Sequence, residues 1–124
     1  WDYPMASFTK TVLKAGSGAC PSRGSTVTVA ADLYLAENNK AIWSTHKPSG
    51  FLFSAENGPQ PFTYQAGVGG VIKGWDEGVA TMQLGERARL AIPWQAAYGA
   101  AGHPGFSIPP KAALVFEIEV LKIQ

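Results

Sequence analysis

The chain has 124 residues, of which 46% are hydrophobic and 15% charged, a balance that predicts one globular domain over residues 1–124 and argues against disorder. Ten Lys and Arg against nine Asp and Glu give a formal net charge of +1, which supplies no strong electrostatic attraction for nucleic acid or anionic lipid. The longest apolar runs are far shorter than the roughly 18–20 residues that span a bilayer, so neither nucleic acid nor a membrane is an expected partner.

The first half of the chain predicts short strands and loops, because 14 Gly and 9 Pro interrupt the sequence. Phe8 to Lys14 is a weak strand candidate. From Thr26 to Leu35 apolar and polar residues alternate, and this period of two predicts a half-buried strand. Pro48 to Gln60 is interpreted as a long loop whose apolar tip, Phe51 to Phe53, either folds back onto the domain or binds a partner.

Two further elements are predicted towards the middle of the chain. Gln60 to Gln65 is a second weak strand candidate. Trp75, Val79 and Met82 recur at i, i+4 and i+7, and this spacing predicts the only good helix, near residues 75–83.

The C-terminal part contains two clear strand patterns. Glu86 to Ile92 alternates apolar residues with outward arginines, and Leu114 to Ile123 alternates apolar residues with glutamates. Strands on both sides of one short helix predict an α+β fold. We expect an antiparallel sheet of about five strands with the helix across its concave face.

Polar catalytic machinery is scarce in this sequence. The two histidines, His46 and His103, lack metal-ligand spacing, and no Gly-x-Ser-x-Gly motif marks a serine hydrolase. Gly67 to Gly70 lacks the full dinucleotide-binding fingerprint. We therefore expect no metal and no cofactor, and a pocket must work by shape and apolar surface.

The single cysteine, Cys20, excludes an internal disulfide and fits a reducing, cytoplasmic compartment. A monomer is the expected state. No signal peptide, transit peptide or lipidation motif is visible. The chain opens at Trp1 rather than at methionine, which leaves open a segment removed upstream.

Several motifs follow one another in the second half of the chain. They read Val71-Ile72-Lys73-Gly74-Trp75-Asp76-Glu77-Gly78-Val79, Met82-x-Leu84-Gly85-Glu86-x-Ala88, Tyr98-Gly99-x-x-Gly102-His103-Pro104-Gly105, Ile108-Pro109-Pro110 and Leu114-Val115-Phe116-Glu117-Ile118-Glu119-Val120-Leu121. With this order and spacing the chain resembles the FKBP class of peptidyl-prolyl cis-trans isomerases, the immunophilins. Trp43-Ser44-Thr45 resembles the small plant-like members of that family.

The resemblance implies a strongly twisted antiparallel sheet wrapped around one short helix, with an apolar pocket between them. It implies cis-trans isomerisation of X-Pro bonds in protein substrates, which assists folding, and binding of macrolides such as tacrolimus or rapamycin. Trp75 would form the pocket floor under the prolyl ring, while the Tyr98 hydroxyl and the Ile72 backbone N–H would donate hydrogen bonds. The implied catalytic residues are Trp75, Tyr98, Phe116 and Phe62, and the implied binding residues are Ile42, Trp43, Val71, Ile72, His103 and Ile108. His103 either contributes to binding or only shapes its loop.

The sequence departs from the family pattern at several positions. Ala31 stands where the family commonly has a pocket tyrosine, and Trp43 stands where many members have an aspartate. The rim around Phe106 differs in length by about one residue, and the loop from His46 to Pro61 is longer than in minimal members. We therefore expect macrolides to bind more weakly than to members carrying the tyrosine and aspartate.

Three functions remain open at this point. An active isomerase is favoured by Trp75, Tyr98 and Phe116. A catalytically weak or inactive binding and chaperone module that uses the same groove is favoured by Ala31 and Trp43. A carrier of small apolar molecules is the third reading.

Overall fold

The computed structural model describes residues 7–45 and 61–124. The predicted loop over Pro48 to Gln60, its apolar tip and His46 lie outside the described residues.

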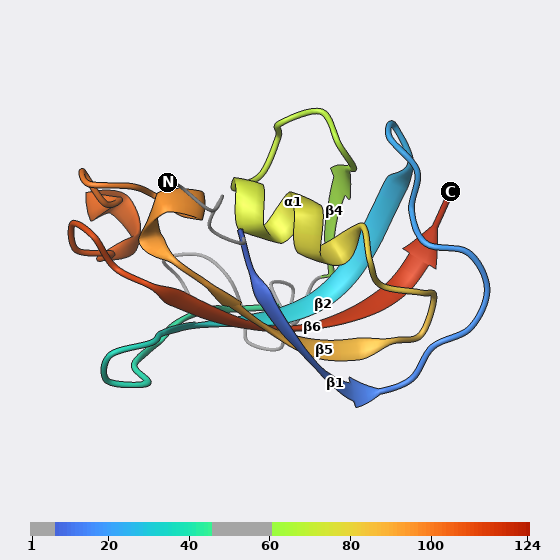
Figure 1. The fold of residues 1–124 in the computed structure, drawn as a ribbon, viewed down its shortest axis with the longest axis horizontal. Helices are drawn as coiled ribbons and strands as arrows, with labels where there is room; N and C mark the ends of the chain where they lie inside the picture. The colour runs from blue at the N-terminus through green and yellow to red at the C-terminus, as the bar shows by residue number, and fades with distance from the viewer. Residues whose placement is uncertain (1–6, 46–60) are drawn as a thin grey trace, which may run out of the picture.

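An antiparallel sheet forms the framework of the described part of the chain, and α1 lies across one face of it (Figure 1). Its six strands are β1 (Thr9–Lys14), β2 (Thr26–Leu35), β3 (Ala41–Ser44), β4 (Phe62–Gln65), β5 (Arg87–Ile92) and β6 (Leu114–Ile123). The strand order is β1-β5-β6-β2-β3, and β4 also pairs with β2. The expected α+β fold with an antiparallel sheet is confirmed, and β3 is the strand that the alternation pattern did not predict.

One edge of β2 is shared by two short strands. The first half of β2 pairs with β4, with Val29 opposite Phe62, whereas the second half pairs with β3, with Leu33 opposite Trp43. The other edge of β2 pairs with β6, where Leu33 lies opposite Phe116. Residues far apart in the sequence are therefore brought together around the middle of β2.

The alternation predicted for the long strands is confirmed by burial. In β2 the residues Val27, Val29, Ala31, Leu33 and Leu35 are all buried. The inward residues of β5 and β6 complete this side of the core, because their alternate positions are buried in the same way. Because a strand places successive side chains on opposite faces, one face of the sheet carries the core and the other carries the charged residues.

The helix α1 spans Lys73–Val79 and is shorter than the sequence predicted. After Val79 the chain tightens into turns, with the Thr81 N–H donating to the Gly78 carbonyl over 3.1 Å and the Met82 N–H to the Val79 carbonyl over 2.9 Å. Met82 is still fully buried. Met82 therefore continued the apolar spacing of the helix in the sequence, although it lies in a turn beyond the end of the helix. This turn packs into the same core.

Two short 3-10 helices, η2 (Trp94–Ala96) and η3 (Pro104–Phe106), lie in the connection between β5 and β6. No helix among the described residues is long and apolar enough to cross a membrane.

Candidate active site

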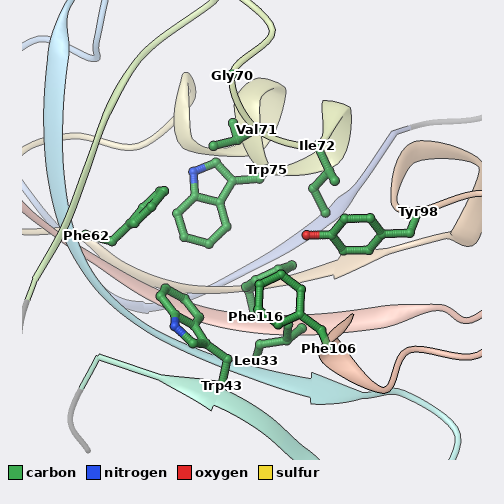
Figure 2. A pocket seen from close by; sticks show the side chains of 10 residues that line it. All are labelled: Leu33, Trp43, Phe62, Gly70, Val71, Ile72, Trp75, Tyr98, Phe106 and Phe116. Carbon is green, nitrogen blue, oxygen red and sulfur yellow. The ribbon is translucent and has the colours of Figure 1, made fainter. Parts of the chain in front are cut away.

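An apolar pocket of about 270 Å³ opens between α1 and the sheet (Figure 2). It is lined by Leu33, Trp43, Phe62, Gly70, Val71, Ile72, Trp75, Tyr98, Phe106 and Phe116. None of these lining residues is charged, and six of them are aromatic. The pocket can therefore hold an apolar group away from water, with few polar atoms to orient it.

Trp75 forms the centre of the aromatic cluster. Its ring meets Phe116 edge to face with centroids 4.9 Å apart, and Phe62 in the same way at 5.6 Å. The Trp43 ring lies tilted at 6.4 Å. Such edge-to-face contacts are favourable because the positive ring edge meets the negative ring face. The neighbouring aromatic side chains therefore fix the position of the indole.

Two glycines allow α1 to approach the sheet closely enough to place Trp75 there. A Cβ atom at Gly74 would overlap Ile92 Cγ2, and one at Gly78 would lie 2.7 Å from Leu90 Cδ1. Larger side chains at these positions would push the helix away from β5. The spacing of Gly74, Trp75 and Gly78 thus sets the depth of the pocket floor.

The walls opposite the helix come from the two strands that share the β2 edge. Trp43 in β3 and Phe62 in β4 meet edge to face at 5.8 Å. Leu33 and Phe116, which pair across β2 and β6, complete this side. Leu33 was not among the expected site residues, although its inward position in the alternation of β2 was visible in the sequence.

Tyr98 brings the hydroxyl group of the pocket. Figure 2 shows this hydroxyl directed towards the space between Ile72 and Phe116. Burial raises the pKa of Tyr98 above its ordinary value, so the hydroxyl keeps its proton at neutral pH and can donate a hydrogen bond. Ile72 lies directly before α1, where backbone N–H groups have no partner within the helix.

His103 lies behind the lining residues rather than among them. Its Nδ1 accepts a hydrogen bond from the Phe106 backbone N–H over 3.2 Å, and its ring stacks on Phe106 at 4.5 Å. It also meets Tyr98 edge to face at 5.0 Å. These contacts favour the loop-shaping role of His103, because its ring packs against Tyr98 and Phe106, which both line the pocket.

The expected site residues divide into those that line the pocket and those that do not. Trp75, Tyr98, Phe116, Phe62, Trp43, Val71 and Ile72 all line the pocket, whereas Ile42, His103 and Ile108 do not. Ile108 is buried in the core and bridges His103 through backbone hydrogen bonds, and Ile42 packs against the core. Phe106 and Gly70 were not expected, because their placement depends on loop geometry that no periodicity encodes.

Ala31, which stands where the family commonly has a pocket tyrosine, does not reach the pocket. It is fully buried and is not among the lining residues. Its backbone N–H donates to Thr45 Oγ1 over 2.9 Å, and the Thr45 N–H donates back to the Ala31 carbonyl over 2.9 Å. The apolar wall in this part of the pocket is instead provided by Leu33 and Trp43. Among the described residues no cluster of His, Cys, Asp and Glu could hold a metal ion.

Comparisons with known proteins agree with the fold and show the family of the chain. Residues 18–121 match the FKBP-type peptidyl-prolyl cis-trans isomerase family. The chain is 47% identical over 117 residues to the peptidyl-prolyl cis-trans isomerase FKBP12 of Vicia faba, covering 93% of this chain and 96% of that protein. It is 42% identical over 111 residues to FK506-binding protein 1 of Dictyostelium discoideum, covering 90% of this chain and 92% of that one.

A solved structure, the N-terminal domain of FKBP42 from Arabidopsis thaliana, superimposes with a TM-score of 0.80 at 29% identity, covering 95% of this chain and 87% of that one. The chain belongs to the FKBP-type peptidyl-prolyl cis-trans isomerase family, as the resemblance of its motifs predicted.

Proposed function

We propose that this chain catalyses the cis-trans isomerisation of X-Pro bonds in protein substrates, and that the aromatic pocket around Trp75 is the active site. The observation that carries the proposal is the pocket itself. It has an indole floor, aromatic walls and no charged lining residue, and a tyrosine hydroxyl points into it.

The chemistry of prolyl isomerisation needs no nucleophile. The X-Pro amide resists rotation because resonance gives its C–N bond partial double-bond character, with a barrier of about 18–20 kcal/mol. The planar amide is charge-separated, so a dry apolar pocket disfavours it relative to the twisted form. Catalysis then follows because the pocket binds the twisted transition state better than either planar isomer.

The proposed roles follow from the position of each side chain. Trp75 lies under the prolyl ring, Phe62, Val71 and Phe116 enclose it, and Trp43 extends the wall towards the substrate chain. The Tyr98 hydroxyl and the Ile72 backbone N–H donate hydrogen bonds to substrate carbonyls. His103, Ile42 and Ile108 act by holding the lining residues in place.

We extend the proposal to macrolide ligands of the tacrolimus and rapamycin kind. The name of the Dictyostelium relative states that it binds FK506, and an apolar pocket of about 270 Å³ suits an apolar ring that mimics proline. Trp43 replaces the carboxylate that many members offer to a ligand hydroxyl, so the affinity is expected to be lower.

A catalytically weak binding module is the second candidate, and Trp43 is the residue that favours it. We further propose that residues 1–124 form one domain that acts as a monomer, and that it works in the cytoplasm, where a free thiol such as that of Cys20 stays reduced. A protease-coupled assay with a proline tetrapeptide separates the two candidates. An active isomerase increases the rate in proportion to its concentration, whereas a weak or inactive binding module leaves the rate at or near that of buffer.

A further inference from the structure

Two buried polar atoms behind the pocket floor lack a hydrogen-bond partner within the described part of the chain. They are Tyr64 Oη and Trp75 Nε1. The two residues belong to one contact, because their rings meet edge to face with centroids 5.9 Å apart at an angle of 80°. A buried polar atom without a partner is costly, so two of them in one contact call for an explanation.

The two atoms are chemically complementary. An indole N–H can only donate a hydrogen bond, and a phenol oxygen can accept one. Burial raises the pKa of Tyr64 to about 12, and the nearby Trp75 N–H opposes part of that rise. The phenol is therefore neutral in the physiological range, and the indole N–H lies within electrostatic reach of its oxygen.

Tyr64 is also well placed to hold another residue. It lies in β4, where its backbone pairs with Val27 in β2, and its ring stacks on Phe62 at 5.9 Å. Trp75 projects from the short helix α1, a different element. A bond between the two side chains would tie the floor of the pocket to the rigid sheet.

We propose that Tyr64 is a positioning residue of this site, whose hydroxyl oxygen accepts a hydrogen bond from the Trp75 indole N–H after a small rotation of either ring. This bond fixes the orientation of the indole on which the prolyl ring rests. The consequence for activity rests on the proposed isomerase function, whereas the hydrogen bond itself does not.

The matched pair of variants is Tyr64→Phe and Tyr34→Phe. Each removes one phenol oxygen, but Tyr34 lies on the opposite face of the sheet, away from the pocket. In ¹⁵N-labelled protein the Trp75 indole proton is one of four tryptophan indole signals. We expect Tyr64→Phe to move this signal upfield and to accelerate its exchange with solvent, and we expect Tyr34→Phe to leave it unchanged.

The kinetic measurement follows on the same proteins. A lost neutral hydrogen bond that orients the floor should reduce kcat/KM for a proline tetrapeptide by roughly two- to tenfold, with an unchanged far-UV circular dichroism spectrum. Tyr34→Phe should keep the parent value. In the parent, a Trp75 indole proton that shifts little with temperature gives a second sign of the bond, which does not depend on any variant folding.

Three results would overturn the proposal. The first is a Trp75 indole signal that Tyr64→Phe leaves in place, and the second is a steep temperature dependence of that signal in the parent. The third is an indole signal that moves while kcat/KM stays at the parent value, which would leave Tyr64 without a positioning role. A parent protein without isomerase activity would instead contradict the proposed function, and the indole signal would still decide whether the bond exists.

Discussion

Trp75 is the residue on which the pocket depends most, because four aromatic rings pack against its indole. These rings belong to Trp43, Phe62, Tyr64 and Phe116. The same contacts bury the indole almost completely, since only 3% of Trp75 is exposed. Core and site therefore share residues, and a change in one must affect the other.

Replacing Phe116 with alanine tests this sharing directly. Phe116 is 4% exposed, so the truncation should lower the free energy of unfolding by about 3–5 kcal/mol through lost burial and the cavity it leaves. Urea unfolding measures this loss, and Phe116→Leu is the milder control. Activity should fall in both variants, and parent-like activity in Phe116→Ala would contradict its role as a wall.

Replacing Trp43 with aspartate tests how this pocket differs from many of its relatives. A carboxylate that accepts a ligand hydroxyl is worth roughly 1.5–3 kcal/mol when the hydrogen bond is fully formed, so the variant should bind tacrolimus more tightly than the parent. Fluorescence titration gives both affinities. Equal or tighter binding by the parent would show that the indole face of Trp43 compensates for the missing carboxylate.

The raised pKa of Tyr64 predicts a stability change at high pH. The phenol of the unfolded chain ionises near 10.0, and that of the folded chain at about 12. Between these values the unfolded state loses the proton first, so the free energy of unfolding should fall as the pH rises from about 10 to about 12. Urea unfolding over this range should show a smaller fall for Tyr64→Phe, and identical slopes would contradict the prediction.

At the scale of elements, the long strands were predictable because their burial repeats every two residues. The buried positions of β2 are the apolar positions of the sequence. The strand β3 was missed because Ala41–Ser44 is too short for alternation to register. Its pairing depends on β2, which lies beside it only in the folded chain.

The site was predictable where a side chain belongs to one of the motifs, as Trp75 and Tyr98 do, and less so outside them, as Leu33 and Phe106 show. Trp75 and Phe116 were placed by motifs that lie in α1 and β6. Phe106 was missed because it belongs to η3, next to Ser107, whose backbone adopts a left-handed conformation with φ of 57°. No periodicity of the sequence encodes such a local geometry.

The contact between α1 and β5 yields a prediction with an internal control. A Cβ at Gly74 would meet the Ser7 carbonyl oxygen at 2.6 Å as well as Ile92, whereas one at Gly78 would meet only the Leu90 side chain. Gly74→Ala should therefore cost about 1–3 kcal/mol of stability and reduce activity. Gly78→Ala should cost less, since the Leu90 side chain can shift, whereas the Ser7 carbonyl beside Gly74 belongs to the backbone. The reverse order in thermal unfolding would contradict this account.

At the scale of the whole molecule, the site is assembled from elements that are distant along the chain. The central strand β2 carries β6 on one edge and both β3 and β4 on the other, and α1 crosses above them (Figure 1). This arrangement surrounds one indole with rings from three strands. The apolar surface that we propose receives the substrate proline is therefore part of the folded core.

The central claim is that this apolar surface lowers the barrier to X-Pro rotation without a group that gains or loses a proton near neutral pH. NMR exchange measurements on a tetrapeptide with a hydrophobic residue before proline give the isomerisation rate without a coupled protease. The account predicts a rate that rises in proportion to the protein concentration and stays constant from about pH 6 to about pH 8. A rate equal to that of buffer, or a bell-shaped dependence on pH, would contradict it.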